Sequence, residues 1–201
     1  MPATALSTAL SERVLHRLGF SGWKEATPAS LKALYAAWCQ KVPFDNVQKL
    51  IYLRNGSSGP LPGSTAEHFF ETWLQHGTGG TCWAGAGALA SLLTTLGFQA
   101  QRGLATMLVA PDLPPNHGTV LVSFASGESY LVDTSILHSA PLPLHPGGIS
   151  SVGHPAWGIQ ATRPEARWHL HWRPLHVPGG FTCRLENFEQ HQQAFNDRHE
   201  Q

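Results

Sequence analysis

The chain has few charged residues. Lysine, arginine, aspartate and glutamate make up 13% of its 201 residues, about half of the ~25% that is typical of soluble domains. Thirteen basic residues balance thirteen acidic ones, so no strong net charge draws the chain toward nucleic acid or an anionic membrane surface. We therefore expect neither nucleic acid nor a membrane as a partner.

Long apolar runs and paired cysteines are missing as well. No stretch approaches the ~18 apolar residues of a membrane-spanning helix, and the N-terminus lacks the basic and apolar segments of a secretory leader. The three cysteines, Cys39, Cys82 and Cys183, form no Cys-x-x-Cys pair. This spacing argues against a disulfide framework and favours a reducing compartment, so we expect a cytoplasmic protein.

The first half of the chain has helical periodicity. Apolar side chains recur every three or four residues in three segments, which predict helices over residues 11–18, 28–40 and 66–76. Gly19 is suited to end the first helix and Thr27 to cap the second. Residues 1–10 are expected to be a frayed lead-in.

The second half has the alternation that is typical of strands. It predicts strands over residues 98–109, 118–124, 129–133 and 168–172. A short turn joins the second and third of these into a hairpin. Residues 141–165 are rich in proline, glycine, serine and histidine, so we expect mostly loop there. The polar tail from Glu186 is compatible with a helix but lacks a strong apolar stripe.

One stretch combines a tight turn with a thiol. The pair Gly79-Gly80 allows the turn, Cys82 follows two residues later, and small residues then lead into an apolar helix that ends near Leu96. The free N–H groups and the dipole of a first helical turn favour a thiolate, which makes Cys82 a candidate nucleophile. The alternative is that Cys82 is an ordinary buried residue, as we expect for Cys39 and Cys183.

The predicted hairpin could supply the partners that such a nucleophile needs. His117 begins its first strand and Asp133 ends its second, so both lie at the same end of the sheet. A cysteine nucleophile needs a base, and the base needs a carboxylate to fix its tautomer. With twelve histidines in the chain, His117 could also be an ordinary histidine, and Asp133 could only cap a strand end.

Four motifs in the same order resemble those of the arylamine N-acetyltransferases. Residues 78–82 (Thr-Gly-Gly-Thr-Cys) resemble the family's Arg-Gly-Gly-x-Cys, and residues 43–46 (Pro-Phe-Asp-Asn) are similar to its Pro-Phe-Glu-Asn. Residues 117–122 match a histidine that opens an apolar strand, and residues 130–136 resemble Tyr-Leu-Val-Asp-Val-Gly-Phe. The resemblance covers roughly residues 12–145.

The resemblance implies an α+β fold, with an N-terminal helical bundle followed by an antiparallel β-barrel around a cysteine-proteinase-like Cys-His-Asp core. It divides the chain into a helical domain over residues 1–96 that carries the nucleophile and a barrel domain over residues 97–183 that carries the histidine and aspartate. Residues 184–201 would form a tail, the start of a lid region that is short or absent.

The resemblance also implies an activity. Cys82, His117 and Asp133 would form a catalytic triad that moves an acetyl group from the co-substrate acetyl-CoA, through a cysteine thioester, to an arylamine or hydrazine. We expect a monomer or homo-oligomer without a metal. Four residues are expected to contact substrate, namely Phe44, Trp83, Gly118 and Thr119.

The departures from the family motifs leave other functions open. Thr78, Ala84, Ala86 and Ser135 stand where the family usually has arginine, an acidic residue, asparagine and glycine. Small residues could pack neutrally without an ion pair, or the site could be reshaped for another acyl donor or acceptor. The alternatives are a thiol hydrolase or transglutaminase-like enzyme, and a silent binding protein with an unreactive Cys82.

A metal site is the remaining alternative for the histidine-rich second half. His169 and His171 share one strand face, and His176 follows. No cysteine or carboxylate lies near enough in the sequence to complete a ligand set convincingly. We therefore favour no metal.

Overall fold

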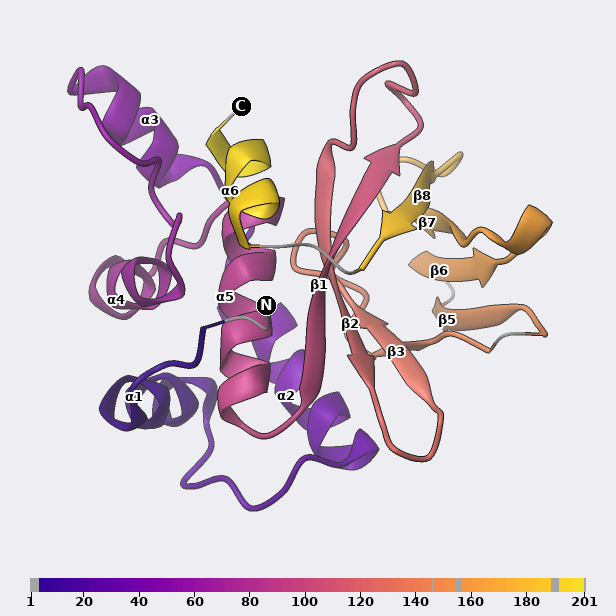
Figure 1. Ribbon diagram of the computed structural model, residues 1–201, viewed down its shortest axis with the longest axis horizontal. Helices are drawn as coiled ribbons and strands as arrows, with labels where there is room; N and C mark the ends of the chain where they lie inside the picture. Colours follow the sequence, from indigo (N-terminus) through magenta and orange to yellow (C-terminus); the bar gives the residue numbers. More distant parts are fainter. Residues whose placement is uncertain (1–3, 146, 155–156, 189–191, 201) are drawn as a thin grey trace.

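The computed structural model describes residues 4–145, 147–154, 157–188 and 192–200, with helices gathered on one side and strands on the other (Figure 1). The helices are α1 (Thr8–Leu18), α2 (Pro28–Lys41), α3 (Val47–Arg54), α4 (Ala66–His76), α5 (Cys82–Thr95) and α6 (Gln192–Glu200), with a short 3₁₀ turn at Pro164–Ala166. None of the helices in the described part of the chain is long and apolar enough to cross a membrane.

The helix ends follow the expected local chemistry. Gly19 ends α1 in the left-handed conformation with φ +99°, and Thr27 forms a capping box with Ser30 at the start of α2. The prediction of a frayed lead-in is wrong from Leu6 onward. The Leu6 side chain is buried and its N–H donates to Thr95 Oγ1 at 2.8 Å, so the helical core holds this segment.

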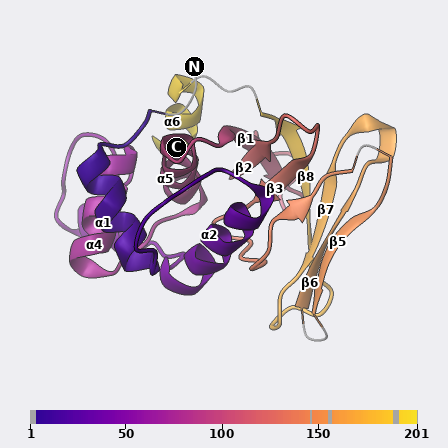
Figure 2. The same ribbon diagram turned by 90° about the horizontal axis from the view of Figure 1, so that it is seen from below.

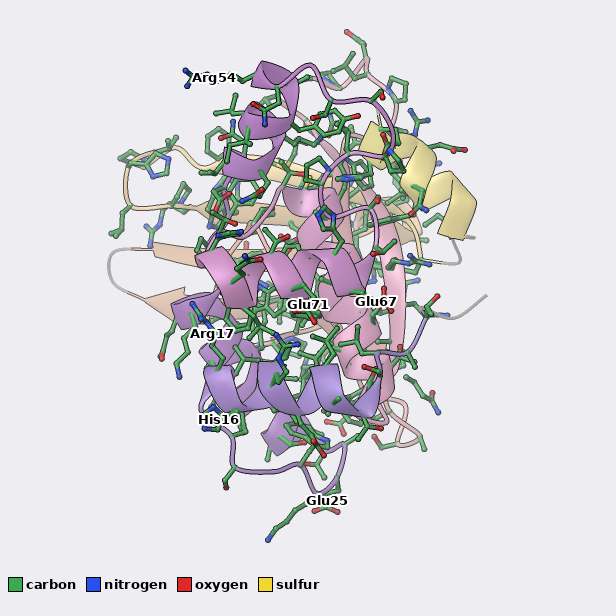
Figure 3. All side chains as sticks on the ribbon, turned by 90° about the vertical axis from the view of Figure 1, so that its left-hand side faces the viewer. His16, Arg17, Glu25, Arg54, Glu67 and Glu71 are labelled. Carbon is green, nitrogen blue, oxygen red and sulfur yellow. The ribbon has the colours of Figure 1, made fainter. Side chains whose placement is uncertain are left out.

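Two helices of the bundle are joined across their exposed faces. α1 and α4 lie side by side, with Arg17 on α1 and Glu71 on α4 (Figure 3). Arg13 makes a bidentate ion pair with Glu71, with N···O distances of 2.7 and 2.8 Å. The Arg17 guanidinium lies over the Trp73 ring, 5.1 Å from its centre. These contacts fix α4, whose last residue precedes the turn that leads to Cys82.

The described strands form one antiparallel eight-stranded sheet in the order β4-β3-β2-β1-β8-β7-β6-β5. Its strands are β1 (Gln99–Met107), β2 (His117–Ser123), β3 (Ser129–Val132), β4 (Leu142–Pro143), β5 (Ser150–His154), β6 (Trp157–Thr162), β7 (His169–Arg173) and β8 (Phe181–Asn187). The edge strands β4 and β5 contact each other, so the sheet curls into a nearly closed barrel. The predicted α+β fold, helices followed by an antiparallel barrel, is confirmed.

The prediction of mostly loop over residues 141–165 is wrong. This segment contains β4, β5 and β6, and β5–β7 stand apart from the helices (Figure 2). Inward-facing Ile159 and Ala161 are buried, whereas Gln160 between them is exposed. The strand alternation is therefore present, but the small and polar residues around it hide it.

Two hydrophobic clusters fill the molecule. One lies between the helices and the face of β1–β3 that the helices cover. The other lies inside the barrel. The division at residues 96 and 183 stays a prediction, although β8 crosses the second position and continues to Asn187 between β1 and β7. Helix α5 packs on both β1 and β2, which places its first residue beside the sheet.

Candidate active site

The turn before Cys82 is held by the segment that links α2 to α3. Asp45 accepts hydrogen bonds from the N–H of Gly79 at 2.7 Å and from that of Val47 at 3.0 Å, and its own N–H donates to Gly80 O at 3.2 Å. A Cβ on Gly79 would lie 1.7 Å from Pro43 O. Only glycine therefore allows this approach, and the two motif segments form one unit.

Cys82 is the first residue of α5 and is partly exposed. Gly85 donates its N–H to Thr81 O at 2.9 Å, so the N–H groups before it belong to the open first turn, which has no intrahelical acceptors. Gly85 also lets α5 approach the turn after Asp133, because a Cβ there would lie 2.6 Å from Thr134 Oγ1. The helix thus sets its thiol close to the strand ends.

His117 and Asp133 form a buried pair at those strand ends. His117 Nε2 lies 2.7 Å from Asp133 Oδ2, and the two side chains are 5% and 0% exposed. The second carboxylate oxygen, Oδ1, accepts from the N–H of Ser135 at 2.9 Å, from its hydroxyl at 3.1 Å and from the N–H of Ile136 at 2.8 Å. Both oxygens of Asp133 are therefore oriented by hydrogen bonds.

The site favours an ionised pair. Burial alone would lower the pKa of His117, but the charge and hydrogen bond of Asp133 and the hydrogen bond to Cys82 raise it well above its ordinary value. Burial would likewise raise the pKa of Asp133, but His117 and the two turn N–H groups hold it well below its usual range. The structure thus brings Cys82, His117 and Asp133 together, with His117 in the middle.

The other two cysteines lie in environments that suppress ionisation. Burial raises the pKa of the Cys39 thiol to about 11 and that of the Cys183 thiol to about 12. Neither thiol is therefore a thiolate near neutral pH, which fits the expected structural roles.

The four residues expected to contact substrate are placed differently from one another. Phe44 is 50% exposed, and its backbone bridges to Gly80 beside the nucleophile. Trp83 is buried, and a Cβ on Gly118 would lie 2.8 Å from its ring. Thr119 is 0% exposed, so its side chain faces the core rather than an opening. Phe44 is the exposed member of the set.

A cavity of about 240 Å³ lies behind Trp83, on the face of α5 that α6 covers. The small residues Gly87 and Ser91 leave space on this face of the helix. Phe195 on α6 packs edge-on against Trp83, with ring centres 5.1 Å apart. Cys82 lies outside the residues that line it. Trp83, the residue after Cys82, is part of the lining.

The motif departures have local structural reasons. The Thr78 hydroxyl accepts a hydrogen bond from Gln48 Nε2 at 3.0 Å. Ala84 and Ala86 are 3% and 0% exposed, and a Cβ on Gly80 would lie 3.0 Å from that of Ala84. The small residues fill a tight space, so no room is left for a charged side chain at Ala84.

Strand β7 carries two of the histidines considered for a metal site. No group of three or more His, Cys, Asp or Glu side chains within the described ranges could hold a metal ion. His171 is exposed and His169 is partly exposed on β7.

Sequence reasoning missed Asp45, although it lies in a quoted motif, because nothing in the sequence pairs an aspartate with the N–H of a residue 34 positions later.

Comparison with known proteins identifies the family. A family model described as N-acetyltransferase matches residues 28–171, which is most of the chain. The chain belongs to the arylamine N-acetyltransferase family. A curated arylamine N-acetyltransferase of Mycolicibacterium smegmatis is 25% identical over 176 residues, which cover 81% of this chain and 62% of the relative.

Solved structures of the family share the fold. The Mycobacterium marinum arylamine N-acetyltransferase in complex with CoA superposes with a TM-score of 0.72 at 22% identity, covering 92% of this chain and 68% of that one. A Bacillus cereus arylamine N-acetyltransferase, described with a unique Cys-His-Glu catalytic triad, gives 0.73 at 19% identity, covering 96% and 75%. The chain thus spans about 62% of the curated relative and somewhat more of these two structures.

Proposed function

We propose that this protein is an acetyl-CoA-dependent N-acyltransferase that moves an acetyl group through a Cys82 thioester to an arylamine or hydrazine. The observation that carries the proposal is the buried His117–Asp133 pair, hydrogen-bonded to a thiol at the first turn of a helix. A cysteine, a base and an orienting carboxylate are the parts that thiol-based acyl transfer needs. Three free cysteines fit a reducing, cytoplasmic compartment.

In the first half-reaction the Cys82 thiolate attacks the thioester carbonyl of acetyl-CoA. The bond from that carbon to the CoA sulfur breaks, and CoA leaves as a thiol with the proton of the His117 imidazolium. We assign the open N–H groups of the first turn of α5 to the developing oxyanion, because they have no acceptor within the helix. The products are free CoA and an acetyl thioester on Cys82.

In the second half-reaction the amine nitrogen attacks that thioester. The bond from carbon to Cys82 sulfur breaks, and His117 takes the proton that the nitrogen loses. The amide leaves, and the thiolate–imidazolium pair is restored. Asp133 stays ionised throughout and keeps Nε2 of His117 fixed, so that Nδ1 is the ring nitrogen left to serve Cys82.

The relatives support the choice of substrates. One solved neighbour is in complex with CoA, and another carries a Cys-His-Glu triad in which a glutamate takes the carboxylate's place. By analogy, Asp133 is assigned the carboxylate role here. The relatives are named for arylamine acceptors, from which we take the acceptor class.

The proposal is tested by incubating the protein with acetyl-CoA and an aniline or aryl hydrazine, and by following CoA and acetylated amine by chromatography. We expect both products in equal amounts, and more than a hundredfold less with His117→Gln, because general-base loss typically costs about 10²–10⁴. His169→Gln, on β7, is the matched control and keeps the activity. CoA release without acetylated amine would instead identify a hydrolase, and no release would leave a silent homologue.

A further inference from the structure

A tyrosine of the helical half holds the backbone of Asp133. Tyr35 lies on α2 and is 1% exposed. Its hydroxyl donates to Asp133 O at 2.7 Å and also lies 3.3 Å from Ile136 O. The same oxygen accepts from the N–H of Asp133 at 3.2 Å and from that of His138 at 3.4 Å. One hydroxyl thus contacts both ends of the turn that carries the aspartate.

This turn also orients the Asp133 carboxylate. Oδ1 is bound by the N–H groups of Ser135 and Ile136, which belong to the same turn, and this leaves Oδ2 directed at His117 Nε2. The carboxylate therefore points correctly only while the turn keeps its shape. In the Asp133–Ile136 turn, the Ile136 carbonyl lies next to Tyr35, so the hydroxyl braces the turn against the helix bundle.

We infer that Tyr35 is a positioning residue that acts on His117 and Cys82 through Asp133. The inference rests on the proposed function, since it concerns the same triad. It adds a fourth element, α2, to the elements that assemble the site.

The surroundings keep this hydroxyl a constant donor. Burial raises the pKa of Tyr35 well above its ordinary value, so the hydroxyl is protonated near neutral pH. Four other titratable groups sense the charge of Asp133, namely His117 on β2, His138 after β3, Cys39 on α2 and Cys183 on β8. Of these, His117 makes the direct side-chain hydrogen bond.

His138 does not compete for the aspartate. Its ring centre is 4.9 Å from that of Tyr35, and its Nδ1 pairs with Ala140 O at 2.6 Å. Burial lowers the pKa of His138 to about 4, so its ring is neutral near pH 7. It therefore packs against Tyr35 and leaves the negative charge of Asp133 to His117.

The test removes the hydroxyl and keeps the ring. In Tyr35→Phe we expect the pH profile of Cys82 alkylation by iodoacetamide to move upward by about 0.5–1 pH unit. That shift makes alkylation roughly three- to tenfold slower on the acidic limb. The modified cysteine is identified by peptide mass spectrometry. Tyr130→Phe, on the strand β3 that leads to Asp133, is the matched control. Its hydroxyl contacts the exposed side chain of Glu128, so we expect the alkylation profile of this variant to match that of the wild type.

A double-mutant cycle separates positioning from general destabilisation. If Tyr35 acts through Asp133, the shift caused by Tyr35→Phe disappears when it is made in the Asp133→Asn background. A wild-type profile for Tyr35→Phe, or the same shift in both backgrounds, overturns the inference. Alkylation needs no acyl donor, so a shift seen in a protein that transfers no acetyl group would refute the proposed function and keep the role of Tyr35.

Discussion

At the scale of single residues, the His117–Asp133 pair links stability to pH. The raised pKa of His117 stabilises the fold fully below ~6.5, the ordinary value of an unfolded chain, and this contribution is lost as the pH rises through the raised value. The lowered pKa of Asp133 stabilises the fold fully above ~3.9, and its contribution is lost as the pH falls. The pair therefore contributes most between about pH 4 and 6.5.

We predict that Asp133→Asn lowers the free energy of unfolding by about 3–5 kcal/mol in that window, because it leaves a buried partner uncompensated. Urea unfolding of wild type and variant over a pH series up to about 10 measures the difference. It should shrink at the alkaline end, as His117 of the wild type loses its proton. A difference that is constant with pH would contradict the pairing.

The packing around Ala84 bears on why the family's acidic residue is missing here: small residues either pack neutrally in its place or reshape the site for another acyl donor or acceptor. Its methyl group lies against Gly80 and Gly63 in a space without room for a longer side chain. We predict that Ala84→Glu, which restores the acidic residue typical of the family, lowers the free energy of unfolding by more than about 3 kcal/mol, because it buries an unpaired charge. Thermal unfolding measures the loss, with Ala84→Ser as the small control. An unchanged melting temperature would mean that the space can open.

At the scale of elements, the sequence predicts the helices and strands that have regular caps and a regular apolar periodicity. α4 spans residues 66–76 as predicted, and α2 ends one residue beyond the prediction. α3 is missed because every one of its residues is at least partly exposed, so no buried stripe marks it. The β5–β6 hairpin is missed because Gly153 pairs with Gly158, and glycines lower strand propensity.

The three residues proposed for the site can be predicted from the sequence, but the residues that hold them in place cannot. Cys82, His117 and Asp133 follow from a turn, a strand start and a strand end, which are local signals. The contacts of Asp45 with Gly79 and of Tyr35 with Asp133 join residues 34 and 98 positions apart. In the sequence Tyr35 is only one apolar position of a helix, so its hydroxyl carries no signal of its partner.

The close approach of the Gly79 turn to Pro43 can be tested by substitution. We expect Gly79→Ala to slow Cys82 alkylation at least tenfold and to lower the melting temperature, because its Cβ would lie 1.7 Å from Pro43 O and force the turn apart. Gly22→Ala is the control, since a Cβ there meets nothing within 4 Å. Equal alkylation rates for the two variants would show that the turn does not position the thiol.

At the scale of the whole molecule, the C-terminal helix completes the helical core. Although the tail is polar, Phe195 on α6 is 2% exposed, packs on Trp83 and reaches Gly118. Glu200 accepts the N–H of Leu61 at 2.9 Å, so α6 also binds the loop before α4. Phe195 thus packs α6 against the residue after Cys82.

We predict that Phe195→Ala lowers the free energy of unfolding by about 3–5 kcal/mol, as is typical for a buried phenylalanine. Chemical denaturation measures this loss. Asn196→Ala, at the neighbouring position of α6, is the control and should cost markedly less. Similar small losses for both would show that α6 is not part of the cooperative core.

In the proposed reaction Cys82 carries the acetyl group. Intact-mass spectrometry after mixing the protein with acetyl-CoA tests it most directly, with Cys82→Ala as the control. We expect a mass gain of one acetyl group that is absent in the variant and is removed when an aromatic amine is added. No gain on a protein whose Cys82 is still alkylated rapidly, or a gain that persists in Cys82→Ala, would contradict it.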